Sequence, residues 1–520
     1  MSKAVGAVAT VVVVAGVAWA GTAWYTGSKI EEKLLSSIEK ANVQLKAAAP
    51  DLDANVRLVS FEKGVFSSNA RYSLSIPGSS VETAEGLKPA TKRREVIILD
   101  HIEHGPFPAS RLKSMHFGPV MATSNFVLER NAEADAWFKA TKDVAPLSGH
   151  ANIAYSGDAD GLIRLEPVNY ESGTDGVTFT GLDLNFDVSD KGESSKLDGA
   201  IDALTFKTQD EEGKPSTFDA KTIVINSDMT RMYLGHNEVT IKQFAISVPD
   251  AKVLVTDYAQ RMNLKETDKK ISGTLGYDIG QVNINGKDVA SGQFNLNVKN
   301  LDSEAVQKLS DLYRAAAMRD AQAGDPEGAP EASEEEQKAF MAALTQLLAG
   351  NPSIAIDPFL VKTTKGEARL NVAVDLMKPE GPAMSMDAIA AQMVRSLDAR
   401  LVVAKPVLAE GLAYKATNDG VDAAKAAKDA TAQADVIASL GVQLGAAKVE
   451  GDNLVSTLKY SAGQVDFNGK KMPIEAFGSA IFGMIIGGSM GMGQSEERAK
   501  ELDAPTEEPA TTAPAPAPVR

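Results

Sequence analysis

The sequence predicts an α+β protein that is dominated by strands. We expect long antiparallel meanders in two related modules with inserted helices, preceded by one N-terminal transmembrane helix. Three observations predict this fold. The first 27 residues contain an uncharged apolar run. Residues 110–300 alternate between apolar and polar types, as strands with one buried face do. One strand–turn–strand motif occurs twice.

The uncharged run from Ala4 to Trp24 is long enough to cross a membrane, since 21 helical residues rise about 31 Å. Lys3 lies before it and a cluster of aromatic rings ends it, so we predict a signal-anchor over residues 1–27. Its marker residues are Ala4, Val11, Val14, Trp19, Trp24 and Tyr25. A signal peptide cleaved after the small-x-small pattern Ala18-Trp19-Ala20 is the alternative, and a buried helix of a soluble domain is a third.

The composition excludes several classes of function. The formal net charge of −16 argues against nucleic acid as a partner, because phosphates must be neutralised by Lys and Arg. The chain has no cysteine, which excludes disulfides, thiol nucleophiles and cysteine-bound zinc. We expect no cofactor.

Residues 28–50 have the apolar spacing of an amphipathic helix. The apolar positions are Ile30, Leu34, Ile38, Ala41 and Leu45. Ser28 is a suitable N-cap, and Pro50 marks the end. Such a helix packs on the body of the protein, or else lies on the membrane or pairs with a second copy.

Four short motifs follow one another in a fixed order. They are Trp24-Tyr25-Thr26-Gly27, the run Phe61–Ser68, His104–Phe107, and a closing segment with Leu458, Tyr460, Gly463 and Asn468-Gly469-Lys470. Together they resemble the YdgA-like family of bacterial envelope proteins over residues 1–475. The residues that carry the resemblance are Gly64, Phe66, Ser67, Ser68, His104, Gly105, Pro106, Phe107, Asn468 and Gly469. The resemblance implies a bacterial inner-membrane anchor with the body in the periplasm, and it implies no activity.

Residues 51–300 form the predicted first module. Apolar residues alternate at Val177 and Phe179, and again from Leu182 to Val188. The alternation slips once, at Gly181, which we interpret as a β-bulge.

An internal repeat links the two modules. Thr274–Lys287 and Thr457–Lys470 share nine of fourteen residues. Each copy is predicted to be a strand, a turn at Gly-Gln, a second strand and a type I′ turn at Asn-Gly. Independent selection for hairpin residues is the alternative explanation.

Residues 301–475 form the predicted second module, with helices inserted into strands. Helices are expected over 303–321 and 337–350, and strands from residue 353. Further helices are predicted at Met386–Glu410, despite the β-branched run Leu401-Val402-Val403, and at Asp419–Leu440. The last has no strong apolar stripe, which favours a surface or partner-facing helix.

Residues 476–494 are apolar and rich in glycine. Small residues recur every fourth position, at Ser479, Gly483, Gly487 and Gly491. This spacing is typical of helices that associate closely, so the segment is a candidate for self-association or membrane insertion. A buried glycine-rich helix and a flexible tail are the alternatives. Residues 495–520 are rich in Pro and Ala and are predicted to be disordered.

Titratable residues concentrate in Asp100-His101-x-Glu103-His104. A metal could bind such a set, but residues three apart on a strand point to opposite faces, which disfavours it. Ser37-x-x-Lys40 and Ser110-x-x-Lys113 match the serine–lysine spacing of acyl transferases, without the other motifs of those enzymes. We therefore predict no catalytic, cofactor or metal site.

The sequence favours a non-enzymatic envelope protein that acts in assembly or maintenance, as a scaffold or by self-association. The inner membrane and a second copy of the chain are the expected partners. A periplasmic protein that binds lipid or another hydrophobic ligand on the apolar face of the sheet is the first alternative. A hydrolase whose site assembles only in three dimensions is the second.

Overall fold

The computed structural model describes most of the body of the chain. The described residues are 34, 35, 38, 39, 42, 45, 54–64, 66–77, 81–83, 86–88, 93–189, 194–209, 213–230, 234–249, 251–323, 333–379 and 392–478. The chain divides into two compact units, residues 1–395 and residues 396–520. This division differs from the boundary at residue 300 suggested by the sequence. Each unit is described separately below.

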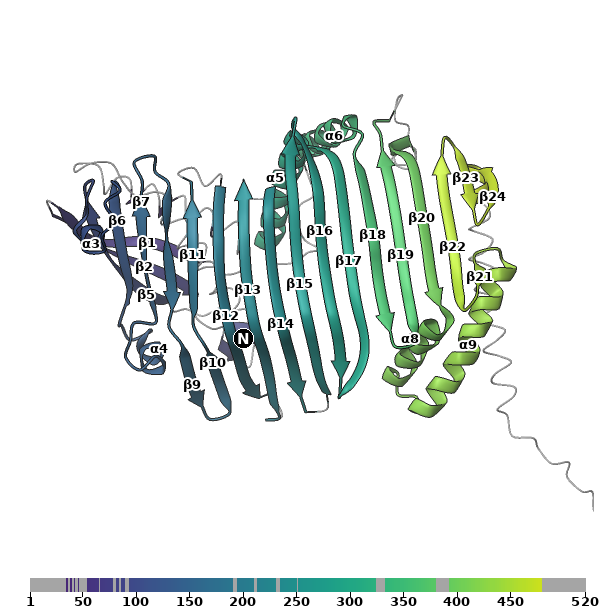
Figure 1. The fold of residues 1–520 in the computed structure, drawn as a ribbon, viewed down its shortest axis with the longest axis horizontal. Coiled ribbons are helices and arrows are strands. Elements are labelled where there is room, and N and C mark those ends of the chain that lie inside the picture. The colour runs from purple at the N-terminus through teal and green to yellow at the C-terminus, as the bar shows by residue number, and fades with distance from the viewer. Residues whose placement is uncertain are drawn as a thin grey trace, which may run out of the picture. The chain divides into compact units, whose positions relative to one another are not determined.

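The first unit is one antiparallel meander (Figure 1). Along it lie β1 (Asn55–Lys63), β2 (Ser67–Pro77), β5 (Arg93–His104), β6 (Ala122–Glu129), β7 (Leu147–Ile153), β8 (Ala159–Leu165), β11 (Leu182–Val188), β12 (Ser194–Gln209), β13 (Pro215–Thr230), β14 (Leu234–Val248), β15 (Ala251–Thr267), β16 (Lys270–Ile284), β17 (Lys287–Asp302), β18 (Ser353–Thr363) and β19 (Gly366–Leu376). Each of these strands pairs with the next. The predicted strand-dominated antiparallel fold is confirmed.

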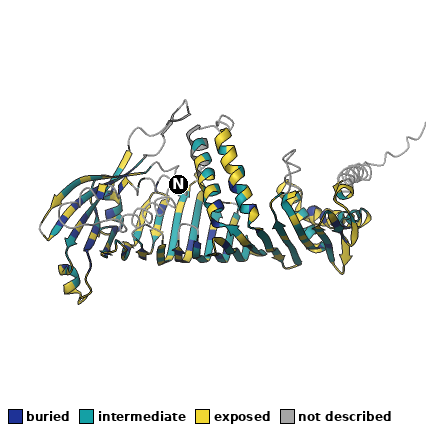
Figure 2. Cartoon of the chain, turned by 90° about the horizontal axis from the view of Figure 1, so that it is seen from above, coloured by how far each residue is buried: buried dark blue, intermediate teal, exposed yellow. Residues whose placement is uncertain are grey.

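The described part of this unit also contains two short hairpins and several helices. The hairpins are β3 (Val81–Thr83) with β4 (Gly86–Lys88), and β9 (Val168–Ser172) with β10 (Asp175–Phe179). The helices are α3 (Ala109–Lys113), α4 (Asp135–Ala140), α5 (Ser303–Ala323) and α6 (Glu334–Ala349). The last two confirm the predicted helices, and α6 begins at a capping box between Ser333 and Glu336. In Figure 2 these two helices stand on one face of the sheet with much of their outer surface exposed.

The pairing is interrupted on five consecutive strands at residues that lie opposite one another. They are Asp202, Thr222, Lys242, Asp257 and Gly280, on β12 to β16. Thr222 and Asp257 both have a φ of 53°, which kinks the strand. We call these five residues the kinked row. Across it, the spacing between apolar residues along a strand changes from two to three, as from Ile201 to Leu204. The row therefore keeps apolar side chains on one face along the whole length of each strand.

The bulge predicted at Gly181 belongs to the same row. Gly181 has a φ of 100° and separates β10 from β11, which pair with the two halves of β12. The hydroxyl of Thr180 accepts a hydrogen bond of 2.9 Å from the backbone N–H of Ala203, which joins the strands across the break.

The helix that precedes β1 packs on the core of this unit. Leu34, Ile38 and Leu45 are buried in the core cluster, whereas Leu35 is 51% exposed. The amide of Asn42 forms two hydrogen bonds with the backbone of Val56, at 2.8 and 2.7 Å. The predicted amphipathic helix is confirmed at the described positions, and packing on the body is the interpretation that these contacts support.

Besides a short helix at residues 474–478, the described part of the second unit contains five strands and two longer helices. They are β20 (Val394–Ala404), β21 (Lys448–Glu450), β22 (Asn453–Ser461), β23 (Gln464–Phe467), β24 (Lys470–Pro473), α8 (Lys405–Asn418) and α9 (Ala423–Gln443). The strands pair in antiparallel fashion around β22 and β23. The two helices pack against one another.

Two helix predictions in this region need correction. Leu401-Val402-Val403 lie in β20, where β-branched residues fit the pleated surface, and the helix begins only at Lys405. The helix predicted at Asp419–Leu440 is α9, but one of its faces is buried, which the sequence did not predict. Ala426, Ala430, Ala434 and Ala438 are buried along one side, because small side chains at this spacing allow close helix packing.

The two copies of the repeat fold differently. The second copy forms the predicted hairpins: Asn468 and Gly469 have φ values of 53° and 84°, which is a type I′ turn. In the first copy the predicted turn at Gly280-Gln281 is wrong, because β16 continues through both residues without reversing direction. Gly280 instead belongs to the kinked row, where a Cβ atom would lie 2.7 Å from that of Asp257.

None of the helices within the described ranges is both long enough and apolar enough to cross a membrane. The predicted anchor, the small-residue stripe from Ser479 to Gly491 and the C-terminal tail all lie outside those ranges.

Candidate functional site

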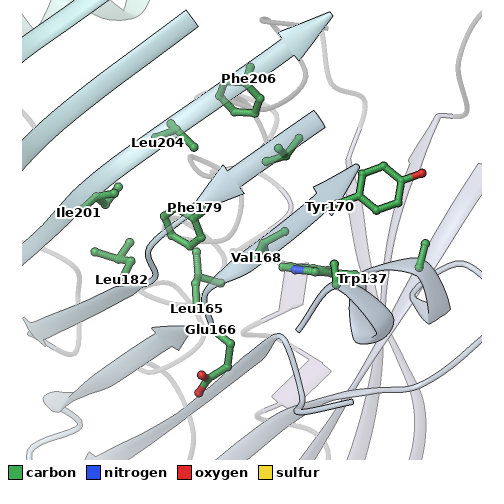
Figure 3. A pocket seen from close by; sticks show the side chains of 13 residues that line it. Trp137, Leu165, Glu166, Val168, Tyr170, Phe179, Leu182, Ile201, Leu204 and Phe206 are labelled. Atoms are coloured by element: carbon green, nitrogen blue, oxygen red, sulfur yellow. The ribbon is translucent and has the colours of Figure 1, made fainter. Parts of the chain in front are cut away.

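An apolar pocket of about 380 Å³ lies in the first unit, between α4 and the sheet (Figure 3). This volume falls at the lower end of the range of small-molecule sites. The pocket is lined by Ala136, Trp137, Ala140, Leu165, Glu166, Val168, Tyr170, Val177, Phe179, Leu182, Ile201, Leu204 and Phe206. Glu166 is the one carboxylate in this lining, and Figure 3 places it at the margin of the pocket.

The kinked row explains the floor of the pocket. Phe179, at the end of β10, and Leu182, at the start of β11, are spaced by three residues across the break. Ile201 and Leu204, on β12, have the same spacing. Without the break, alternation would turn one member of each pair to the opposite face. The row therefore brings apolar side chains from both halves of the sheet into one surface.

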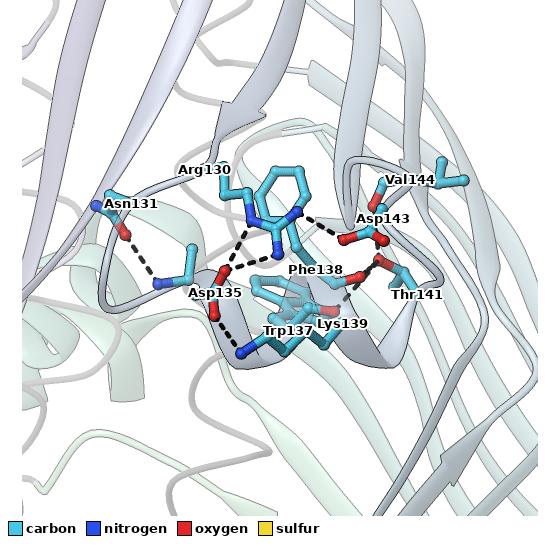
Figure 4. A network of polar contacts seen from close by, with 10 residues as sticks. Arg130, Asn131, Asp135, Trp137, Phe138, Lys139, Thr141, Asp143 and Val144 are labelled. Carbon is cyan, nitrogen blue, oxygen red and sulfur yellow. Dashed lines mark hydrogen bonds and ion pairs between the residues drawn. The ribbon is translucent and has the colours of Figure 1, made fainter.

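The wall of the pocket is α4, which polar contacts hold in place (Figure 4). The guanidinium of Arg130 bonds Asp135 at 2.7 Å and Asp143 at 2.6 Å, and lies 5.5 Å from the ring centre of Phe138. The hydroxyl of Thr141 donates to backbone carbonyls at the end of the helix, the closest being that of Val144 at 2.6 Å. These contacts fix both ends of α4, so Trp137 is held over the sheet.

A row of aromatic rings continues from the pocket across the sheet. It has one ring on each of seven consecutive strands: Phe206, Phe218, Phe244, Tyr258, Tyr277, Phe294 and Phe359, on β12 to β18. In four of the six neighbouring pairs the ring centres lie 6.2 to 6.5 Å apart: Phe206–Phe218, Phe244–Tyr258, Tyr277–Phe294 and Phe294–Phe359. We call these seven residues the aromatic row. Phe206 belongs both to the row and to the pocket lining, so the two apolar surfaces are continuous.

The structure brings two of the short motifs together at the start of β2 and the end of β5. The hydroxyl of Ser68 and Nε2 of His104 share a hydrogen bond of 2.9 Å, and the N–H of His104 donates to Phe66 at 2.8 Å. Gly64 admits no side chain, since a Cβ atom would lie 2.2 Å from the carbonyl oxygen of Ser67. Ser67 pairs with Glu103, and Gly105 has a φ of 98°, which suits a turn before Pro106.

This contact is the kind of serine–histidine pair that a hydrolase assembled in three dimensions would use. A serine hydroxyl lies within hydrogen-bonding distance of a histidine, but Ser68 is only 1% exposed. A nucleophile needs access to its substrate. We therefore interpret the pair as a structural link between the strands.

The cluster at Asp100–His104 is divided between the two faces of β5. Asp100 is buried and accepts from Ser124 at 2.7 Å, while His101 lies on the exposed face against Asn69. Glu103 accepts two hydrogen bonds from Ser110 at 2.8 and 2.7 Å. Burial acts to raise the pKa of Glu103, but these bonds outweigh it and lower the pKa from its usual value. Across the described residues, no cluster of three His, Asp or Glu side chains could hold a metal ion.

Ser37 and Lys40 lie outside the described residues. Ser110 and Lys113 lie on α3, where the Ser110 hydroxyl donates to Glu103. This serine is therefore held by a carboxylate, an arrangement that leaves the serine–lysine spacing without chemical support.

The burial of His104 makes a testable prediction about pH. Burial, aided by the nearby charges of His101 and Lys63, lowers the pKa of His104 below its ordinary value near 6.5. The unfolded chain therefore binds a proton at His104 more readily than the folded chain does. The contribution of neutral His104 to stability is complete above about pH 6.5 and is lost as the pH falls. His104→Gln should reduce the drop in thermal midpoint between about pH 7.5 and about pH 5.5. An equal drop in both proteins would contradict this assignment.

Comparison with known proteins places the chain among bacterial proteins. A family described as "Bacterial protein of unknown function (DUF945)" matches residues 1–475. Protein YdgA of Escherichia coli is 29% identical over 494 residues, covering 92% of this chain and 96% of YdgA. The uncharacterized protein YihF of the same organism is 24% identical over 481 residues, covering 90% of this chain and 96% of YihF. No solved structure is significantly similar.

Proposed function

Because this chain belongs to the DUF945 family of bacterial proteins of unknown function, we propose a role from its own geometry: it binds a hydrophobic ligand with an acyl chain. The ligand enters the pocket beneath α4 and extends along the aromatic row. We further propose that the protein is not an enzyme, that its N-terminal run anchors it in the inner membrane, and that its body binds the ligand in the periplasm.

The continuity of the pocket with the aromatic row carries this proposal. A compact ligand would need only the pocket, whereas a long alkyl chain gains contact area from every further strand it crosses. The rings of the row are half-buried on β12 to β17, and Phe359 is 47% exposed. Rings in this state still offer apolar surface to a ligand. Because Glu166 lies at the margin, we expect a fatty acid to bind with its alkyl chain in the pocket and its carboxylate away from this residue.

The sequence favoured a scaffold in envelope assembly, and this remains the second candidate. Its main support, the small-residue stripe from Ser479 to Gly491, lies outside the described residues. The pocket is a specific feature that a scaffold does not require. We therefore place ligand binding first and keep the envelope as its setting.

Trp137 provides a direct test, because it lines the pocket and the chain has only three tryptophans. In a Trp19→Phe/Trp24→Phe background, Trp137 is the only tryptophan. We expect its fluorescence to be quenched in a saturable way by a bromine-labelled fatty acid, with the full chain held in lipid nanodiscs. Contact with the heavy atoms quenches the indole.

A matched control places the reporter elsewhere in the same unit. Tyr313 lies on α5 and is 77% exposed. Tyr313→Trp, in a background that also carries Trp137→Phe, should show only weak quenching without saturation. If both reporters respond alike, the fatty acid is acting from the nanodisc lipid, and the proposal is wrong.

A further inference from the structure

Five large apolar side chains are exposed together at one end of the first unit. They are Phe66, Phe107, Leu112, Met115 and Phe117, with exposed fractions of 80%, 52%, 44%, 77% and 66%. We call them the apolar tip. They come from the turn between β1 and β2 and from the loop that contains α3. Such a group of exposed apolar residues marks a site of interaction.

Hydrogen bonds hold the two segments of the tip side by side. The N–H of His104 donates to the carbonyl of Phe66 at 2.8 Å, and that of Val120 donates to Pro106 at 3.1 Å. The guanidinium of Arg111 bonds Asn152 on β7 at 2.7 Å, which fastens α3 to the sheet. The tip is therefore a formed surface, and α3, which contributes to it, lies beside β6 in Figure 1.

The charge of the tip is opposite to that of the chain. Residues 105–121 contain Arg111, Lys113 and His116 and no acidic residue, although the whole chain has a formal net charge of −16. Lys63, at the end of β1, is also exposed. Acidic residues near these segments include Glu62, on the same strand as Lys63, and Glu103, which accepts two hydrogen bonds from Ser110. Asp160 accepts a hydrogen bond from Asn152, the residue that Arg111 contacts.

We propose that the apolar tip docks on a bilayer surface that contains anionic phospholipid. Aromatic and aliphatic side chains that alternate with cations suit the boundary between headgroups and acyl chains. A second copy of this acidic chain also carries negative charge, so contact between copies is an outcome that the test must separate from docking on lipid. This docking goes beyond ligand binding, since it involves neither the pocket nor the aromatic row.

The absence of cysteine allows a direct test on the full chain. Met115→Cys introduces a single thiol that can carry an environment-sensitive nitrobenzoxadiazole dye. The labelled protein is reconstituted into vesicles of phosphatidylcholine, with or without phosphatidylglycerol. We expect a blue-shifted emission and quenching by a lipid-borne spin label when phosphatidylglycerol is present. Tyr313→Cys, labelled in the same way on α5, should keep the emission of a dye in water.

The charges are tested separately from the apolar side chains. Lys63→Gln/Lys113→Gln in the Met115→Cys protein should lower the docked fraction, by about fivefold in the docking equilibrium for each charge removed. Two results would overturn the proposal. One is a Met115 label that stays water-like in both vesicles. The other is a blue shift of equal size in detergent without lipid, which would indicate contact between copies of the chain.

Discussion

Leu204→Glu should weaken binding of a fatty acid to the pocket by about tenfold or more. Leu204 lines the pocket next to Phe206, where the pocket meets the aromatic row. The substitution removes an apolar contact worth about 1.5–3 kcal/mol when fully buried. It also places a carboxylate where an alkyl chain must displace its water, which adds a further cost. Saturable quenching of Trp137 measures the loss.

The control for this prediction lies on the same strand. Ala200 is exposed and is not part of the pocket lining, so Ala200→Glu adds the same charge without touching the ligand. It should leave the dissociation constant unchanged. If Leu204→Glu binds as tightly as Ala200→Glu, the fatty acid binds elsewhere, and the pocket loses its assigned role.

The strands could be predicted because each buries one face, and this leaves a period of two in the sequence. The slip at Gly181 was also visible, but only as an isolated irregularity. The alignment of this slip with Asp202, Thr222 and Asp257 depends on which strands pair and in what register. A single strand does not contain that information. The same limit explains Gly280, whose sequence context resembles that of a true turn in the second copy of the repeat.

The pocket could not be predicted from the sequence. Its lining comes from α4 and several strands, and its residue types are those of any ordinary core. One signal was present: an aromatic residue on each of seven consecutive strands, from Phe206 to Phe359. The alanine face of α9 was missed for a related reason, because alanine contributes little to the contrast between helix faces.

The buried polar contacts around Asp100 should have a large effect on stability. Asp100 is 3% exposed and accepts from Ser124, which is also 3% exposed. The phenol of Tyr72 faces the same carboxylate, and burial, followed by the charge of Asp100, raises the pKa of Tyr72 well above its ordinary value. Tyr72 therefore stays protonated. Asp100→Leu should cost about 2–5 kcal/mol, because it leaves two buried hydroxyl groups without their acceptor.

A mutant cycle separates this mechanism from a simple change of packing. If the cost comes from the two unsatisfied hydroxyl groups, then adding Tyr72→Phe and Ser124→Ala to Asp100→Leu should recover most of it. Asp100→Asn, which keeps an acceptor oxygen, should cost less than Asp100→Leu. Urea unfolding, monitored by the fluorescence of Trp137 in the Trp19→Phe/Trp24→Phe background, measures the free energy of unfolding of each variant. Trp137 packs against the same core. A triple variant no more stable than Asp100→Leu would mean that side-chain shape, rather than the polar contacts, holds β2, β5 and β6 together.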